Sequence, residues 1–143
     1  MNYTLLIPVG IVSFLCGLGG YLLALWFGWE QTISTGDLRA VFIWGGLAYL
    51  LTAAPLYLVA IRAVARRVSR LTWALYPICC MALFFIPSAF IMLLFGGSLR
   101  YIVSPEAQLF YGFFLTSGFA FGVGYWLVEN VSAIRDLLMN NKK

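Results

Sequence analysis

The sequence predicts an all-α integral membrane protein, a bundle of four transmembrane helices with both termini in the cytoplasm and short loops. Composition is the first reason: 10% of the residues are charged and 63% are hydrophobic, with a mean hydropathy of +0.95. A soluble domain carries charge on roughly a quarter of its positions, so this surface cannot be wetted by water. The second reason is that four long stretches contain no charged residue, and each is long enough to cross about 30 Å of hydrocarbon.

The four uncharged runs are residues 3–29, 40–61, 71–95 and 109–128. Each is expected to be a helix, because lipid offers the backbone no hydrogen-bond partner and no barrel-type alternation is visible. The first run is interpreted as a retained span, since no Lys or Arg precedes it and it is too long for the apolar core of a signal peptide. The segments between the runs are too short for another domain, so residues 1–143 form a single membrane domain.

Positive charge predicts the orientation, because cytoplasmic loops are enriched in Lys and Arg. With four spans, the loop after the second run and the C-terminal tail lie on the same side. That side holds Arg62, Arg66, Arg67, Arg70, Arg135, Lys142 and Lys143. The opposite side has Arg39 and Arg100. We therefore expect both termini inside, in the inner membrane of a bacterium.

Aromatic residues near the ends of the runs agree with these boundaries, since Trp and Tyr favour the headgroup level. At the outer ends these residues are Trp26, Trp29, Trp44, Tyr101 and Tyr111. Beyond the fourth run, residues 129–143 form an amphipathic tail. Its apolar face consists of Val131, Ile134, Leu137 and Leu138. We expect this tail to extend the fourth helix, then lie along the inner interface, or to dock a partner.

An enzymatic function is not expected, because the chain has no His and no carboxylate in the middle of a span. No catalytic, cofactor-binding or metal-binding residues are predicted. Cys16, Cys79 and Cys80 lie inside runs without a C-x-x-C motif and are interpreted as apolar filler, although the adjacent pair leaves a redox role open. Glu129, at the inner end of the fourth run, is a candidate for an interfacial ion pair with an arginine of the middle loop, or alternatively a coupling carboxylate.

Four arginines form a candidate contact for anionic lipid headgroups. Arg62, Arg66 and Arg70 recur every four residues and would share one face of a continued helix, with Arg67 beside them. Headgroups attract such residues by about 1 kcal/mol each. Nucleic-acid binding is not expected, since these groups are held at the membrane surface.

Prolines predict local breaks in two helices. Pro55 and Pro77 lie about 9 Å from the inner ends of their runs, and Pro87 adds a second break in the third run. Each frees a backbone carbonyl that needs another partner, for which Ser88, Thr116 and Ser117 are candidates. Such breaks are typical of transporter hinges and of curved structural helices alike.

Small residues predict close helix packing. Gly118 and Gly122 form a G-x-x-x-G on the fourth run, and Gly10, Gly17 and Ala24 are spaced by seven on the first. If Gly118 and Gly122 contact a partner, changing them to Leu should abolish association and leave insertion intact. These signals can equally be used inside the bundle.

No family motif is present, but the gross architecture is similar to that of immunity proteins against pore-forming bacteriocins and of small accessory subunits of membrane complexes. The favoured hypothesis is a non-enzymatic accessory, assembly or immunity factor that associates with another membrane protein or with itself. The alternative is a small homo-oligomeric transporter or channel. A lipid-modifying enzyme is the least favoured, with Glu30, Asp37 and Glu106 as the only carboxylates that could converge outside.

Overall fold

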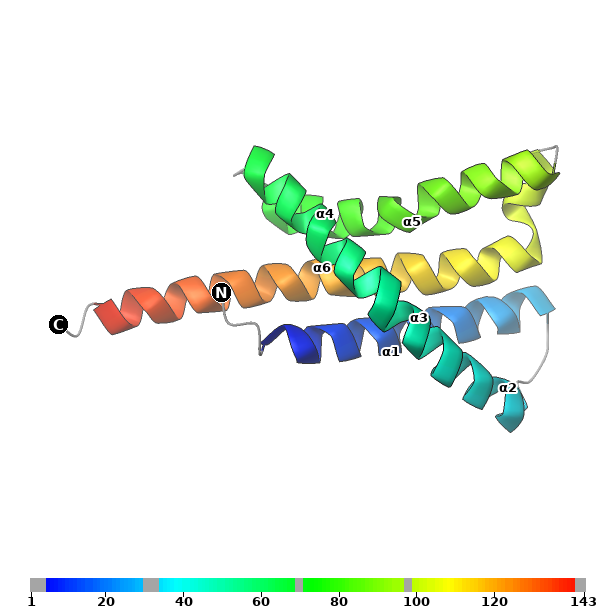
Figure 1. Ribbon diagram of the computed structural model, residues 1–143, viewed down its shortest axis with the longest axis horizontal. Coiled ribbons are helices and arrows are strands. Elements are labelled where there is room, and N and C mark those ends of the chain that lie inside the picture. The colour runs from blue at the N-terminus through cyan, green and yellow to red at the C-terminus, as the bar shows by residue number, and fades with distance from the viewer. Residues whose placement is uncertain (1–4, 30–33, 69–70, 97–98, 141–143) are drawn as a thin grey trace.

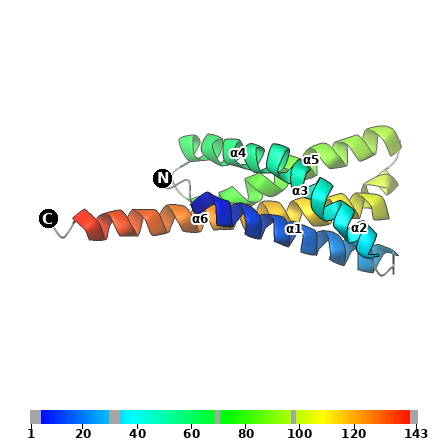
Figure 2. The same cartoon turned by 60° about the horizontal axis from the view of Figure 1, so that its bottom comes forward.

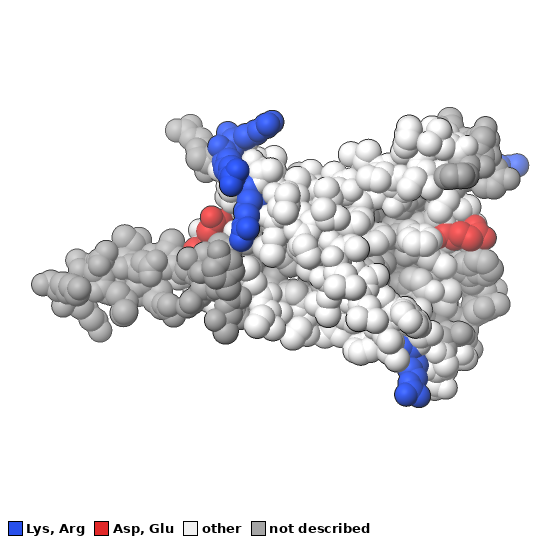
Figure 3. Space-filling model, viewed as in Figure 1, with Lys and Arg blue, Asp and Glu red and all other residues white. Residues whose placement is uncertain are grey.

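The computed structural model describes residues 5–29, 34–68, 71–96 and 99–140, with side chains on the last helix described as far as Val131. Four helices in these residues are long and apolar enough to cross a membrane: Leu6–Gly28, Leu38–Arg67, Thr72–Leu94 and Pro105–Val131. The chain is thus a multi-pass, all-helical membrane protein, as the sequence predicts. On the face shown in Figure 3, charged side chains gather at the two ends, and the band between them is uncharged.

The first, third and fourth spans are α1 (Leu6–Trp29), α5 (Thr72–Gly96) and α6 (Pro105–Asn140). The 36 residues of α6 make it about 54 Å long, well beyond the thickness of the hydrocarbon layer. It follows a short 3₁₀ helix, η4 (Leu99–Val103). Ser104 caps it by accepting the Ala107 N–H at Oγ (3.3 Å), while Pro105 occupies the first turn, where no N–H is needed. The helix therefore begins before and ends well after the predicted run at 109–128.

The second span is one continuous helix in which α-helical and π-helical turns alternate. Its parts are α2 (Thr35–Ala40), η2 (Val41–Gly45), α3 (Gly46–Ala48), η3 (Tyr49–Ala53) and α4 (Ala54–Arg67). Pro55 lies in the first turn of α4 and has no backbone N–H to donate. The regular α-helical hydrogen-bond pattern is therefore interrupted there, next to the π-helical turn η3. Pro77 and Pro87, by contrast, both lie within the single α-helix α5.

Three helices form a layer, and the second span crosses one face of it. In Figures 1 and 2, α1, α6 and α5 lie side by side with α6 in the middle, and the second span runs diagonally over them. The close packing of α6 with both α1 and α5 supports this arrangement. The start of α1 and the end of α6 lie at the same end of the molecule, as expected for four antiparallel spans.

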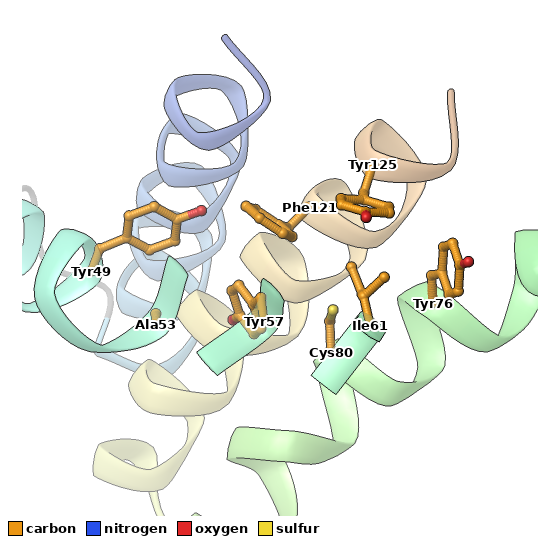
Figure 4. Close-up of a cluster of buried hydrophobic side chains, with 8 residues drawn as sticks. All are labelled: Tyr49, Ala53, Tyr57, Ile61, Tyr76, Cys80, Phe121 and Tyr125. Carbon is orange, nitrogen blue, oxygen red and sulfur yellow. The ribbon is translucent and has the colours of Figure 1, made fainter. Parts of the chain in front are cut away.

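A stripe on the second span forms the centre of the core. Tyr49, Ala53, Tyr57 and Ile61, spaced four residues apart, are all buried. In an α-helix such a spacing drifts by about 40° per step; the wider turn of η3 reduces this drift between Tyr49 and Ala53. Figure 4 shows the stripe facing the side chains that it meets on α5 and α6. These are Tyr76, Cys80, Phe121 and Tyr125.

Candidate functional site

Four buried hydroxyl groups from three spans meet at the crossing point of the second span. Tyr49 Oη donates to Ser13 Oγ of α1 (2.7 Å), and Ser13 Oγ donates to the backbone carbonyl of Ser117 on α6 (2.7 Å). Tyr57 Oη lies 3.0 Å from Ser117 Oγ, and both can reach the carbonyl of Phe114 at 3.4 Å. The hydroxyls therefore satisfy one another and link α1, α6 and the second span.

Sequence analysis did not predict this hydroxyl cluster. Its members lie far apart in the sequence, and each looks like an isolated polar residue in an apolar run. Thr116 and Ser117, two of the three candidate partners for carbonyls freed by proline, form other bonds. Thr116 Oγ1 lies within hydrogen-bond distance of the carbonyls of Cys16 on α1 (3.0 Å) and Gly112 on α6 (2.6 Å), so its one O–H can be donated to either.

Gly118 and Gly122 lie at the contact between α6 and α5. A Cβ on Gly118 would lie 2.9 Å from the backbone of Cys80, and one on Gly122 would meet the backbone of Pro77. The G-x-x-x-G face is thus occupied within the chain. Leucine at either position would force α6 away from α5, so these substitutions cannot separate partner association from folding.

A second glycine contact joins α1 to α6. A Cβ on Gly17 would lie 2.9 Å from the Ser117 Cβ, and one on Gly20 would meet the Gly112 carbonyl and Thr116. Gly112 in turn lies against Gly20. Of the predicted α1 stripe, Gly17 belongs to this contact, but Gly10 does not, since nothing lies within 4 Å of its would-be Cβ.

The opposite face of the layer carries an open apolar groove between α1 and α6. Its volume is about 710 Å³, and Met81 is the contribution of α5. Lining residues include Cys16, Gly19 and Leu23 of α1, and Ala120, Val123 and Leu127 of α6. None of the lining residues comes from the second span, which crosses the other face. Gly19 has no atom within 4 Å of its would-be Cβ, so the groove is open at this position.

Two smaller clefts lie beside the second span, where it diverges from the layer. One, of about 300 Å³, is lined by Tyr21, Thr52 and Phe113 among others. The other, of about 470 Å³, is lined by Gly10, Phe14 and other residues of α1, the second span and α6. Tyr49 borders both clefts.

The charged groups predicted to act at the inner interface lie at one end of the molecule. Arg62, Arg66 and Arg67 are exposed on the last turns of α4, while Arg70 lies outside the described residues. Glu129 is exposed and forms a hydrogen bond with the hydroxyl of Tyr76. Among the described residues its partner is therefore a tyrosine of α5, and no arginine of α4 is paired with it.

The remaining candidates show no assembled reactive site in the described residues. Cys16 is exposed in the groove, Cys79 is half-buried and Cys80 is buried in the core, all three as free thiols. No group of three His, Cys, Asp or Glu residues that could hold a metal ion occurs in that part of the chain. Glu30 and the side chain of Asp37 lie outside the description, as do the tail side chains Ile134, Leu137 and Leu138.

The fold defines a small polytopic membrane protein with a core of paired hydroxyl groups and an open apolar groove on its surface. Comparison with family models, curated proteins and solved structures finds no match for this chain.

Proposed function

We propose that this protein is a non-enzymatic membrane protein that works by packing against the transmembrane helices of another membrane protein, as an accessory, assembly or bacteriocin-immunity factor. The groove between α1 and α6 carries this proposal. It combines an apolar lining with an unfilled position at Gly19, which allows a second helix backbone to approach closely. Without a hydrophobic driving force in lipid, such close approach is what holds helices together.

The pairing of the core hydroxyl groups supports association over transport. The hydroxyls of Ser13, Tyr49, Tyr57 and Ser117 bond to one another or to backbone carbonyls, and the glycine contacts bring α6 against both neighbours. In a single copy no described charged side chain lies in this centre. The alternative, a transporter or channel, would need a pathway formed between copies of the chain.

We place both termini and the arginines of α4 in the cytoplasm of a bacterial inner membrane, on the grounds of the charge bias. The exposed Arg62, Arg66 and Arg67 then lie at the level of the inner headgroups. Their contact with anionic lipid would hold the end of the second span at that level.

The groove is tested by a matched pair of substitutions on α1. Gly19→Leu fills the groove, whereas Gly10→Leu adds the same side chain at a position that is also open but lies half a turn away on the helix. Native mass spectrometry after extraction in mild detergent should show a complex for the parent and for Gly10→Leu, and its loss for Gly19→Leu. A complex that survives Gly19→Leu would refute the groove as the binding surface. Solute flux in reconstituted vesicles, abolished by Glu129→Gln, would favour the transporter.

A further inference from the structure

The larger of the two clefts beside the second span opens towards the end of the molecule where α4 ends. In Figure 1 the second span crosses α1 and then diverges from it in that direction. The volume of the cleft, about 470 Å³, lies within the range of about 300–1,000 Å³ that is usual for ligand pockets. On α1 the lining runs from Leu6 to Leu15, about 14 Å along the helix axis, which is close to half of the roughly 30 Å hydrocarbon layer. The cleft is therefore about as deep as one leaflet of a bilayer.

The lining of this cleft is suited to hydrocarbon. Every lining residue is glycine, aliphatic or aromatic, and the one side-chain hydroxyl, that of Tyr49, is bonded to Ser13. The lining thus offers no charge to an ion and no free donor to a polar solute. Ile11, Leu15 and Leu50 are exposed, so the cleft is open to the surrounding lipid. Since side chains that face an empty gap lose van der Waals contacts, an acyl chain in the cleft is favoured over a void.

One face of the second span leads from this cleft to the arginines of α4. The residues on this face that line the cleft recur every four residues and are Phe42, Gly46, Leu50, Ala54 and Leu58. Arg62 and Arg66 continue the same spacing. Arg62 follows Leu58 by about one turn of α4, which is about 6 Å along the axis, and is exposed. A basic group therefore lies one turn beyond the last lining residue of the second span.

These arginines are available to an anion. Figure 3 shows basic side chains gathered over the end of α4, on the face of the molecule that the second span crosses. Among the described residues no carboxylate forms an ion pair with Arg62 or Arg66, and Glu129 at the same end is bonded to Tyr76. A guanidinium group donates two parallel hydrogen bonds to phosphate oxygens. A phosphate at the arginines and a hydrocarbon chain in the cleft are the two parts of a single phospholipid.

We infer that the larger cleft and the adjoining arginines form a binding site for one anionic phospholipid. Its phosphate lies on Arg62 and Arg66, and one acyl chain runs along Leu58, Ala54 and Leu50 between the second span and α1. This inference rests on the contact between the α4 arginines and anionic lipid that is proposed above, and it adds the cleft that holds the chain. It does not depend on the groove between α1 and α6, which lies on the other face of the layer.

Native mass spectrometry of the delipidated protein tests the headgroup with phosphatidylglycerol and phosphatidylcholine that carry the same acyl chains. The parent should bind one phosphatidylglycerol in preference, because phosphatidylcholine carries a compensating cation. Arg62→Gln should weaken phosphatidylglycerol binding about fivefold, which corresponds to about 1 kcal/mol for one basic residue at an anionic surface. Arg39→Gln, an exposed arginine near the other end of the second span, should not weaken it. Equal binding of the two lipids by the parent overturns both the site and the proposed headgroup contact.

Ala54→Leu tests the cleft, because it extends a side chain into this space from a half-buried position of the lining. The preferred phosphatidylglycerol should be lost from the native spectra. Ala40→Leu adds the same bulk at an exposed position of the same span outside the cleft and should retain the lipid. Binding that is weakened by Arg62→Gln but unchanged by Ala54→Leu overturns the cleft and leaves the headgroup contact standing.

A photoreactive group on the acyl chain of phosphatidylglycerol locates the chain without any substitution. At one lipid per protein, label in residues 6–15 and 50–58 supports the site. Label concentrated at Leu23, Val123 and Leu127 places the chain in the groove between α1 and α6, and label spread evenly over the four spans shows no preferred position; either result overturns the inference. The proposed association is measured separately, as a protein complex that is lost with Gly19→Leu.

Discussion

At the residue scale, a hydrogen bond from Tyr49 to Ser13 connects the second span to α1. Removing the tyrosine hydroxyl and removing the serine hydroxyl leave different groups unpaired. Ser13 accepts from Tyr49 and donates to the Ser117 carbonyl. Tyr49→Phe leaves Ser13 with its acceptor, whereas Ser13→Ala leaves a buried tyrosine hydroxyl unpaired. An unpaired buried hydroxyl costs about 1–3 kcal/mol, so the two losses are not equal.

We therefore expect Ser13→Ala to lower the free energy of unfolding by about 1–3 kcal/mol, and Tyr49→Phe to lower it by less. The double variant should be no less stable than Ser13→Ala alone, because the orphaned hydroxyl is gone. Unfolding in mixed detergent micelles measures all three. Additive losses in the double variant would show that the two hydroxyls are not coupled.

Tyr111, unlike Tyr49, has a hydroxyl group without a partner to lose. Its hydroxyl is buried and has no hydrogen-bond partner among the described residues, while its ring packs against Phe85 (centroids 4.9 Å apart). We expect Tyr111→Phe to leave stability unchanged or raise it by about 1 kcal/mol, since an unsatisfied group is removed and the ring contact is kept. Tyr57→Phe is the matched control and should be destabilising. A clear loss of stability for Tyr111→Phe would mean that its hydroxyl has a partner in the membrane.

At the scale of the helices, neighbouring glycines on α1 have different roles. A Cβ on Gly20 would meet the backbone of α6, whereas one on Gly19 meets nothing within 4 Å. We expect Gly20→Ala to destabilise the bundle by about 1–3 kcal/mol through overpacking. Gly19→Ala should be neutral in thermal unfolding of the same detergent-solubilised protein. Equal effects of the two alanines would contradict the orientation of α1.

The sequence predicts the four helices well but not their contacts. Hydropathy determines a span, because every residue in it must suit lipid. The same fact makes all faces of a span alike, so the sequence does not show that Gly118 and Gly122 face α5 or that Gly19 faces outward. The sequence also does not predict the π-helical turns of the second span. Pro55 predicts an irregularity in the helix, but not whether it is a kink, a 3₁₀ turn or a π-helical turn. Ser13 and Ser117 are joined only by the packing of α1 on α6.

At the scale of the whole molecule, orientation is tested directly. Reporter fusions near Arg67 and after Lys143 should report the cytoplasm, and insertions near Gly36 and Ser104 should report the outside, because the positive charges favour the first pair of sites. The antiparallel order of the four spans requires the members of each pair to agree. A cytoplasmic signal from Gly36 would reverse the topology.

The central place of α6 has a consequence for biosynthesis. Of the four spans, α6 is synthesised after the other three, yet α1 packs chiefly against it and α5 depends on it for its main contact. Until the residues after Val103 have been inserted, α1 and α5 lack their main packing partner, and Ser13 and Tyr57 lack their hydrogen-bond partners on Ser117 and Phe114. A chain that stops at Val103 should insert three spans and then be degraded faster than the full chain in a pulse-chase experiment. Synthesis of α6 as a separate polypeptide in the same cell should restore its lifetime.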